Sequence, residues 1–217
     1  MRYGADHKAM TRQRILQAAA VVFRRLGFQA ASVDHVMAEA GLTAGGFYAH
    51  FATKEDLFHQ AFLQTLQQGQ VIRGKEAEHL QGSERIQSIA SKYLSRAHRK
   101  MPDRGCPLPP LLAELPRQSR ATRDAFQLAL NEIMADLRPH LAGATPAQQS
   151  DRAIALLATM IGGLSLSRAV ADETTADQIL AACRRSIDDA LQRTTSTKKK
   201  RPRPQSPAKP ARKKGKS

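Results

Sequence analysis

The chain has 217 residues and a formal net charge of +15, and its hydrophobic fraction of 41% includes only 5% aromatic residues and no Trp. Two cysteines are too few for a disulfide framework and lack metal-ligand spacing, which excludes a disulfide-stapled secreted domain and favours a reduced, cytoplasmic setting. The longest apolar run, residues 153–166, is too short to span a bilayer, and residues 1–10 lack the apolar core of a signal peptide. We expect a soluble all-α protein without a metal or cofactor.

The first ten residues contain Arg2 and Lys8, and their composition predicts a flexible arm. Such an arm can reach into a minor groove, but an unanchored, frayed terminus is an equally good interpretation. An amphipathic helix follows and ends at Gly27. Its apolar positions recur at helical spacing: Ile15, Leu16, Ala19, Val22, Phe23 and Leu26.

The next stretch, residues 32–57, predicts a helix, a tight turn and two further helices. Ser32 is a good N-cap, and Gly41 supplies the left-handed residue that stops the first helix. Thr43 is expected to cap the second helix, which ends near Ala49. Two helices joined by so short a glycine turn cross steeply, and residues 32–51 therefore predict a helix-turn-helix.

The second of these helices has an unusual composition. Gly45 and Gly46 each cost about 1 kcal/mol relative to alanine, and they are useful where a partner approaches the backbone closely. Phe47 and Phe51, spaced i and i+4, are expected to face the protein core.

The polar residues near this helix fit a nucleic-acid surface. Tyr48 and His50 have polar tips suited to phosphate oxygens. A capping-box variant at residues 53–56 opens the following helix and places Lys54 in its first turn, where an anion can be held.

The run AGLTAGGFYAHFATKEDLF, from Ala40, resembles the DNA-binding signature of the tetracycline-repressor (TetR/AcrR) family of bacterial regulators. The resemblance covers about residues 11–62. It implies a three-helix DNA-binding domain at residues 1–60 and a helical domain for ligand sensing and dimerisation at residues 61–193. It also implies that a few residues touch DNA, mostly its phosphates: Ser32, Thr43, Tyr48, His50 and Lys54.

Base readout departs from the usual pattern, because bidentate recognition favours Arg, Lys, Asn or Gln, and residues 43–49 contain none. Readout is instead expected from Thr43, from alanine contacts such as Ala44 with thymine methyl groups, and from DNA shape, with Gly45 and Gly46 allowing close approach.

The second domain is expected to consist of helices around a loop, residues 102–116, that five prolines interrupt. One helix is capped by Ser83, and another starts near Ser119 and closes before Gly143. A pocket for an unknown small-molecule inducer is expected within residues 83–140. Its candidate lining residues, each of which can equally be core or surface, are Tyr93, His98, Cys106, Phe126 and Met134.

Thr145 and Pro146 give a firm start signal for a helix that is apolar nearly all round. One face must pack within its own domain, and another is expected to pack against a partner in a homodimer. The alternative is that the helix is simply central in a monomer. In the resembled family the two C-terminal helices form a four-helix dimer interface. The residues expected there are Met160, Gly162, Gly163, Leu164 and Ile187.

Residues 194–217 contain ten Lys or Arg, four Pro and no acid, and are expected to be disordered. Clustered lysines displace counterions from DNA, so the segment is either a non-specific DNA-holding arm or a solvated tail.

Together these features predict a non-enzymatic transcriptional regulator, most simply a repressor that binds a palindromic operator as a dimer and is released by a ligand. No phosphate loop, G-x-S-x-G elbow or H-E-x-x-H motif occurs. The alternative is a nucleoid-type architectural protein that coats DNA through its basic tail. Either protein would be cytoplasmic and associated with the bacterial nucleoid.

Overall fold

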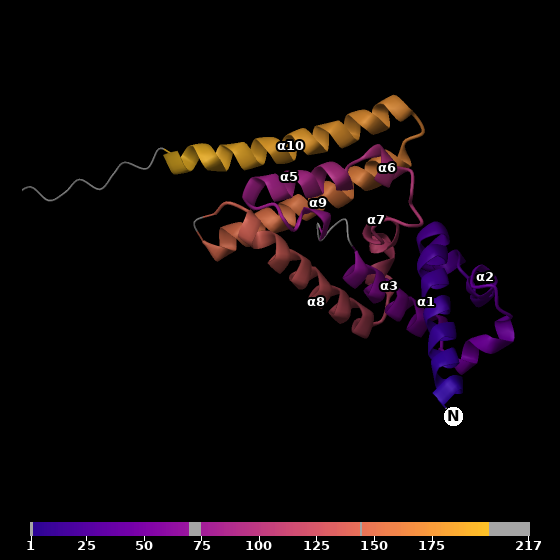
Figure 1. Ribbon diagram of the computed structural model, residues 1–217. Coiled ribbons are helices and arrows are strands. Elements are labelled where there is room, and N and C mark those ends of the chain that lie inside the picture. The colour runs from indigo at the N-terminus through magenta and orange to yellow at the C-terminus, as the bar shows by residue number, and fades with distance from the viewer. Residues whose placement is uncertain (1, 70–74, 144, 200–217) are drawn as a thin grey trace, which may run out of the picture.

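The computed structural model describes residues 2–69, 75–143 and 145–199, and across these ranges every regular element is a helix (Figure 1). The N-terminal part contains α1 (Arg2–Ala30), α2 (Val33–Glu39), η1 (Ala44–Ala49) and α3 (Lys54–Gln68), which we call the head. The remainder, called the body, contains η2 (Lys75–Ala77), α5 (Gly82–Tyr93), α6 (Arg96–Arg99), α7 (Leu108–Leu111), η3 (Leu112–Arg117), α8 (Arg120–Leu137), η4 (Arg138–His140), α9 (Pro146–Ala169) and α10 (Glu173–Lys199).

The head is held together by aromatic packing between α1 and α3. The Phe58 ring lies edge-on to Phe23 at 5.2 Å and to Phe28 at 5.0 Å between centroids. Gly27 takes φ +77°, so the helical conformation breaks there, as the sequence predicted, and the Phe28 ring packs 6.1 Å from the Phe23 ring. The expectation of a flexible N-terminal arm is wrong for the described residues, because α1 is helical from Arg2 onward.

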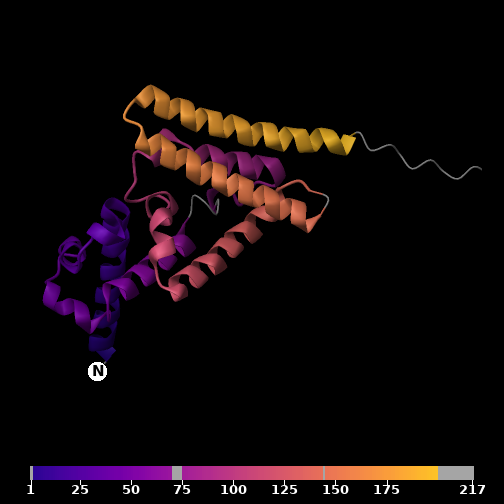
Figure 2. The same ribbon diagram turned by 180° about the vertical axis from the view of Figure 1, so that it is seen from behind.

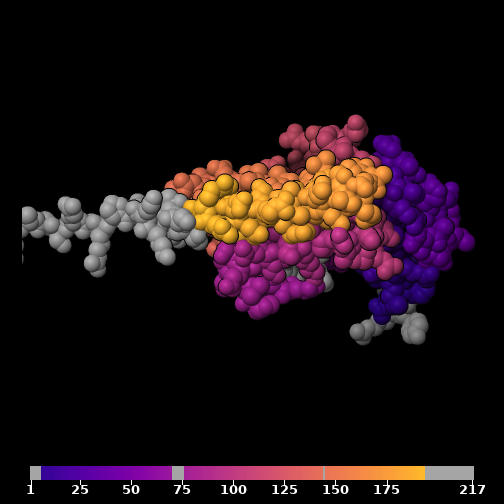
Figure 3. All heavy atoms as spheres, turned by 90° about the horizontal axis from the view of Figure 1, so that it is seen from above, coloured from indigo at the N-terminus to yellow at the C-terminus, as the bar shows by residue number. Residues whose placement is uncertain are grey.

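The body is built on α9 and α10, which run antiparallel and lie side by side with α5 packed against both (Figures 1 and 2). α8 lies between the N-terminal end of α9 and helix α3 of the head, and it contacts both. The space-filling view shows α10 along the outside of the body, with the head at one end (Figure 3). None of the helices within the described ranges has a stretch apolar and long enough to cross a membrane.

Helix starts in the body mostly follow the expected capping residues. Ser119 caps α8 by accepting the Thr122 N–H at 3.2 Å, and Thr145 caps α9 by accepting the Gln148 N–H at 3.2 Å. The start of α5 differs: its N-cap is Gln81, one residue before the helix, rather than Ser83. The helix ends at Tyr93, and Ser95 caps the next helix, α6.

The packing of α9 against its neighbours within the subunit accounts for most of the residues expected at a dimer interface. Met160, Gly163 and Leu164 on α9 and Ile187 on α10 are all buried within the subunit. A Cβ atom at Gly163 would lie 2.6 Å from the Sγ of Cys183 on α10. The helix that approaches Gly163 closely thus belongs to the same chain, and these four residues are covered within the subunit; their place at a subunit interface stays a prediction.

The C-terminal segment is helical further than its composition suggested. The α10 helix continues to Lys199, so the expected disorder does not begin at residue 194. The rest of the basic tail, residues 200–217, lies outside the described residues.

Three hydrogen bonds between described residues join the head to the body. Arg24 Nε donates to the Asp103 carbonyl oxygen at 2.6 Å, and the Phe28 N–H donates to a Glu114 carboxylate oxygen at 2.6 Å. The third joins His59 on α3 to Thr122 on α8 at 3.0 Å. All three attach to α1 or α3, which leaves α2 and η1 projecting away from the body (Figure 1).

Candidate nucleic-acid interface

The first helix of the motif, α2, is fixed at both ends by its own sequence. The Ser32 Oγ accepts the His35 N–H at 3.1 Å, and the Ser32 N–H donates to Nδ1 of His35 at 3.3 Å. The histidine thereby takes the place of the glutamate in a reciprocal capping box. The Ser32 hydroxyl proton is not used by the cap and can donate to a phosphate oxygen.

The turn after α2 is a Schellman motif. Leu42 N–H donates to the Met37 carbonyl at 2.8 Å and Gly41 N–H to the Ala38 carbonyl at 2.9 Å. Gly41 adopts φ +64°, as predicted for the residue that stops this helix. The turn fixes the direction in which the next helix leaves.

That next helix, η1, is a 3-10 helix rather than the expected α-helix. Thr43 occupies the N-cap position but makes no side-chain capping bond, so its hydroxyl remains available to a ligand. A Cβ atom added to Gly45 would have no neighbour within 4 Å, and at Gly46 the nearest atom would be a Met37 methyl at 3.8 Å. Ala44 is exposed beside them, so the backbone here is open to a close partner.

Two phenylalanines fix η1 to the head. Phe47 and Phe51 are buried and stack at 5.9 Å between centroids, as their spacing predicted. Tyr48, between them in sequence, is 74% exposed and packs edge-on against Phe47. Its hydroxyl is therefore presented to solvent by a ring with a fixed position.

The other two residues expected to touch DNA are less open. His50 is half-buried, and its Nδ1 is enclosed without a hydrogen-bond partner in the described part of the chain, which leaves Nε2 as its outward nitrogen. The Lys54 ammonium donates to the carbonyl oxygens of Phe28 and Ala31, both at 3.0 Å, and lies 4.3 Å from the centre of the Phe28 ring.

Lys54 thus caps the carboxyl end of α1, where a positive charge complements the helix dipole. Sequence reasoning missed this role. One of its three N–H groups is left over, and a phosphate contact through that group stays a prediction.

The five candidate ligand residues are not brought together. Tyr93, His98 and Cys106 form a buried polar cluster, in which His98 Nδ1 lies 2.8 Å from the Tyr93 carbonyl oxygen and His98 Nε2 accepts the Cys106 N–H at 3.1 Å. Phe126 instead packs on Phe62 of α3 at 6.0 Å, and Met134 lies two turns further along α8.

Burial dominates the chemistry of this cluster. It raises the pKa of the Cys106 thiol and, together with the neighbouring Cys106, holds the pKa of Tyr93 well above its ordinary value. Burial also lowers the pKa of His98, which agrees with Nε2 acting as an acceptor in a neutral ring. A neutral, enclosed thiol is unreactive, so the geometry favours a structural role for Cys106.

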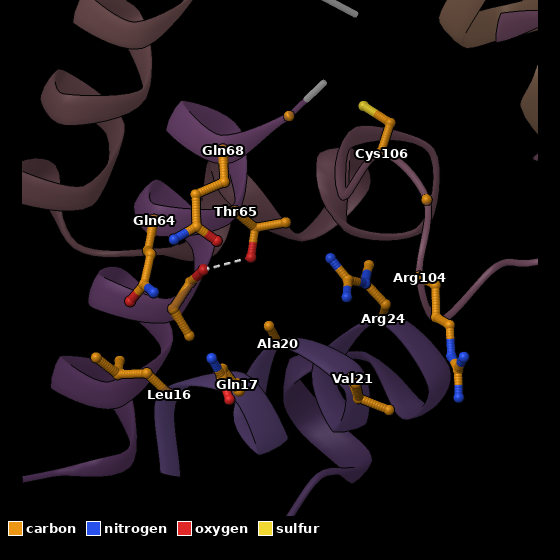
Figure 4. Close-up of a pocket in the computed structure, with 13 residues that line it drawn as sticks. Leu16, Gln17, Ala20, Val21, Arg24, Gln64, Thr65, Gln68, Arg104 and Cys106 are labelled. Atoms are coloured by element: carbon orange, nitrogen blue, oxygen red, sulfur yellow. Dashed lines mark hydrogen bonds between the residues drawn. The ribbon is translucent and has the colours of Figure 1, made fainter. Parts of the chain in front are cut away.

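A cavity of about 570 Å³ lies elsewhere, between the head and the body (Figure 4). Of the five candidates only Cys106 lines it, and sequence reasoning missed the rest of its wall. The main polar residues there come from α1 and α3: Gln17, Arg24, Gln64, Thr65 and Gln68. Gln17 and Arg24 are seven residues apart on α1, and Gln64 and Gln68 are four apart on α3, which places each pair on one helix face, but only the fold shows that the two faces meet.

Comparisons with known proteins agree with this architecture. The model of bacterial regulatory proteins of the tetR family matches residues 15–61, and the tetracyclin repressor-like C-terminal domain model matches residues 82–183. A TetR-family regulator from Agrobacterium tumefaciens superposes with a TM-score of 0.65 over 86% of this chain and 98% of that one, at 19% identity, which shows a shared fold.

Two curated relatives match more locally. The uncharacterized HTH-type transcriptional regulator YfiR of Bacillus subtilis (strain 168) is 35% identical over 74 residues, or 34% of this chain and 36% of the relative. The transposon Tn10 TetC protein of Escherichia coli is 30% identical over 84 residues, or 39% of this chain and 43% of TetC. The chain thus matches less than half the length of each relative. The two family models nevertheless cover both the head and most of the body, and the chain belongs to the tetR family of bacterial regulators, non-enzymatic proteins that bind DNA and control transcription.

Proposed function

We propose that the protein is a repressor that binds a palindromic operator as a homodimer and leaves it when a small-molecule inducer binds. The observation that carries this proposal is the outer surface of the head, where Ser32, Thr43 and Tyr48 present hydroxyl groups around an open 3-10 helix. Hydroxyl groups fixed on a rigid support suit phosphate oxygens, which position a protein on the duplex. We further propose that residues 1–60 and 61–193 divide these tasks, and that the protein acts in the cytoplasm, on the nucleoid.

Sequence selection in this proposal relies on few base contacts. Ala44 can meet a thymine methyl group, and the open backbone at Gly45 and Gly46 lets η1 lie close to a groove. With no Arg, Lys, Asn or Gln on η1 itself, the remaining discrimination falls to sequence-dependent groove width and bending.

The homodimer is supported by the outer face of α9, not by the inner face expected from the sequence. Ile154 is 53% exposed and Leu166 60% exposed, although both are large and apolar. Ala158 and Gly162 lie on the same stripe at four-residue intervals, and no atom lies within 4 Å of a Cβ built at Gly162. A partner helix can therefore approach closely along an uncharged strip.

The inducer is assigned to the cavity between head and body. A molecule bound there touches α1 and α3 of the head as well as the loop at residues 104–106 of the body. Its presence can therefore alter the distance between the two heads of a dimer. A palindrome with half-sites about 34–36 Å apart, or a multiple of that, binds both heads only when their distance matches that of the half-sites.

A binding-site selection from random DNA, followed by footprinting, tests the DNA-binding proposal. We expect one protected palindrome, and we expect Thr43→Val to change the preferred sequence. Thr174→Val, the same replacement at an exposed position of the body, is the matched control and should change nothing. Uniform protection of all sequences would instead support an architectural role.

Sedimentation tests the homodimer. Gly162→Leu places a bulky side chain on the proposed interface and should raise the fraction of monomer without unfolding the subunit, because the position is open. A wild-type protein that sediments as a monomer at micromolar concentration would contradict the proposal.

A further inference from the structure

The cavity between head and body has walls of two kinds (Figure 4). One is apolar and includes Leu16, Ala20 and Val21 of α1. The other carries the amides of Gln64 and Gln68 on α3. Its volume, about 570 Å³, is within the range of sites that enclose a small organic molecule.

The charged residues that line the cavity are all positive. Two of the described lining residues are arginines, Arg24 and Arg104, and none is acidic. Arg104 is exposed at the rim, and its guanidinium points away from the centre in the close-up view, whereas that of Arg24 points inward between the two helices (Figure 4). The inward positive charge therefore belongs to Arg24.

Arg24 has unused hydrogen-bonding capacity. Its Nε donates to the Asp103 carbonyl oxygen at 2.6 Å, but within the described chain no carboxylate forms an ion pair with its terminal nitrogens. Burial lowers its pKa, although nearby Asp103 opposes that shift, so the charge is held in a partly dehydrated place. A guanidinium in this situation presents a fixed fork that matches the two oxygens of a carboxylate.

We propose that this cavity binds an organic monocarboxylate with an apolar body, the carboxylate resting on Arg24 and the apolar part on α1 between Leu16 and Val21. Such a carboxylate would be the inducer of the repressor proposed above. Its release of the protein from DNA rests on that proposed function, whereas its binding to the cavity does not. The amides of Gln64 and Gln68 supply further donors on the α3 wall of the cavity.

Binding at Arg24 acts directly on the attachment of the head. The Nε bond to Asp103 is one of the three hydrogen bonds between described residues of the head and the body, and a carboxylate that turns the guanidinium competes with it. Arg24 also lies one turn before Gly27, where α1 leaves the helical conformation. The occupied and empty cavities should therefore favour different positions of the head.

Calorimetric titration of the full chain in the absence of DNA tests the site. The probes are octanoate and naphthalene-2-carboxylate, each paired with its neutral primary amide and with a phosphate ester of the same apolar group. We expect the carboxylates to bind at least about tenfold more tightly than the amides, and Arg24→Met to abolish this preference, because hydrogen bonds to charged groups carry about that factor.

Arg25→Met is the matched control. It removes the same charge from the next position, where the side chain is exposed and paired with Glu39 at 3.3 Å outside the cavity, and it should leave carboxylate affinity within about twofold. If Arg24→Met fails to fold, Gln64→Glu serves instead: it keeps the shape of the side chain but adds a negative charge to the wall, and it should weaken the carboxylates and spare the amides.

The outcomes separate the site from the function. No binding of either carboxylate, equal binding of carboxylates and amides, tighter binding of the phosphate esters, or an unchanged preference in the Arg24 variant would each overturn the proposed ligand class. Binding that follows Arg24 but does not release operator DNA would uphold the site and overturn ligand release. Release of operator DNA by a neutral molecule, but not by the carboxylates, would uphold ligand release and overturn the proposed carboxylate site.

Discussion

Replacing Gly163 with alanine should destabilise the fold, whereas the same replacement at the neighbouring Gly162 should not. A Cβ at position 163 would lie 2.6 Å from the Sγ of Cys183 and 3.2 Å from a methyl carbon of Leu94. Such overpacking typically costs about 1–3 kcal/mol. At position 162 the added Cβ meets no such neighbour within the subunit, so this cost to the fold of the subunit is absent.

The two variants are matched in a useful way. Each gains about 1 kcal/mol of helix propensity by the change from glycine to alanine, so this gain cancels when they are compared. Their unfolding free energies should therefore differ by roughly 1–3 kcal/mol, with Gly163→Ala the less stable. For a chain of this length that corresponds to a difference in melting temperature of about 2–12 °C.

Urea unfolding and calorimetry at one fixed protein concentration provide the measurement, with sedimentation to confirm that both variants have the same oligomeric state. Adding Cys183→Ala to Gly163→Ala removes the atom at 2.6 Å and should recover about 1 kcal/mol of coupling in a double-mutant cycle. If Gly163→Ala proved as stable as Gly162→Ala, the packing of α10 on α9 described above would be refuted.

Three further variants test other parts of the structure. Lys54→Ala should lower the unfolding free energy by about 1–3 kcal/mol, because the carbonyls of Phe28 and Ala31 lose a charged donor; loss of DNA affinity at unchanged stability would contradict its capping role. Burial depresses the pKa of His98 in the folded state, so the unfolded state binds more protons at acidic pH. The unfolding free energy should therefore show no loss from His98 above about pH 6.5 and should fall as the pH drops below that value. His98→Gln should flatten that decline in urea unfolding between pH 7 and 5, and an unchanged slope would be inconsistent with the shift. Deleting residues 200–217 should flatten the dependence of log affinity on log salt by about 0.9 per lost phosphate contact in DNA titrations, and equal slopes would leave the tail without a role in binding.

Local signals in the sequence were sufficient for the head. The caps at Ser32 and Thr53, the left-handed Gly41 and the buried pair Phe47 and Phe51 all depend on neighbours a few residues away. Interactions of this range are encoded by spacing and residue type alone, which is why the turn geometry could be predicted in detail. The 3-10 form of η1 was missed, because two glycines lower helix propensity without specifying which helix replaces the α form.

Properties that depend on how distant helices meet were not predictable. The apolar pattern of α9 runs nearly all round the helix, so it could not show that Gly163 faces α10 while Gly162 faces outward. Lys54 looks like a free charge in the sequence, because its carbonyl partners lie 26 and 23 residues earlier in the chain. Arg24 had no local feature to distinguish it from the exposed Arg25 beside it until the fold placed α3 opposite.

The end of α1 is held from two sides by groups of opposite charge. Lys54 binds its carbonyl oxygens from within the head, and Glu114 accepts the Phe28 N–H from the body. The Lys54 contact lies within the head, whereas the Glu114 contact joins the head to the body, so one can be lost without the other. Breaking the Glu114 bond frees the head from this part of the body while the lysine still ties α1 to α3. Loss of the Glu114 bond alone therefore leaves the packing inside the head, and the shape of its outer surface, intact.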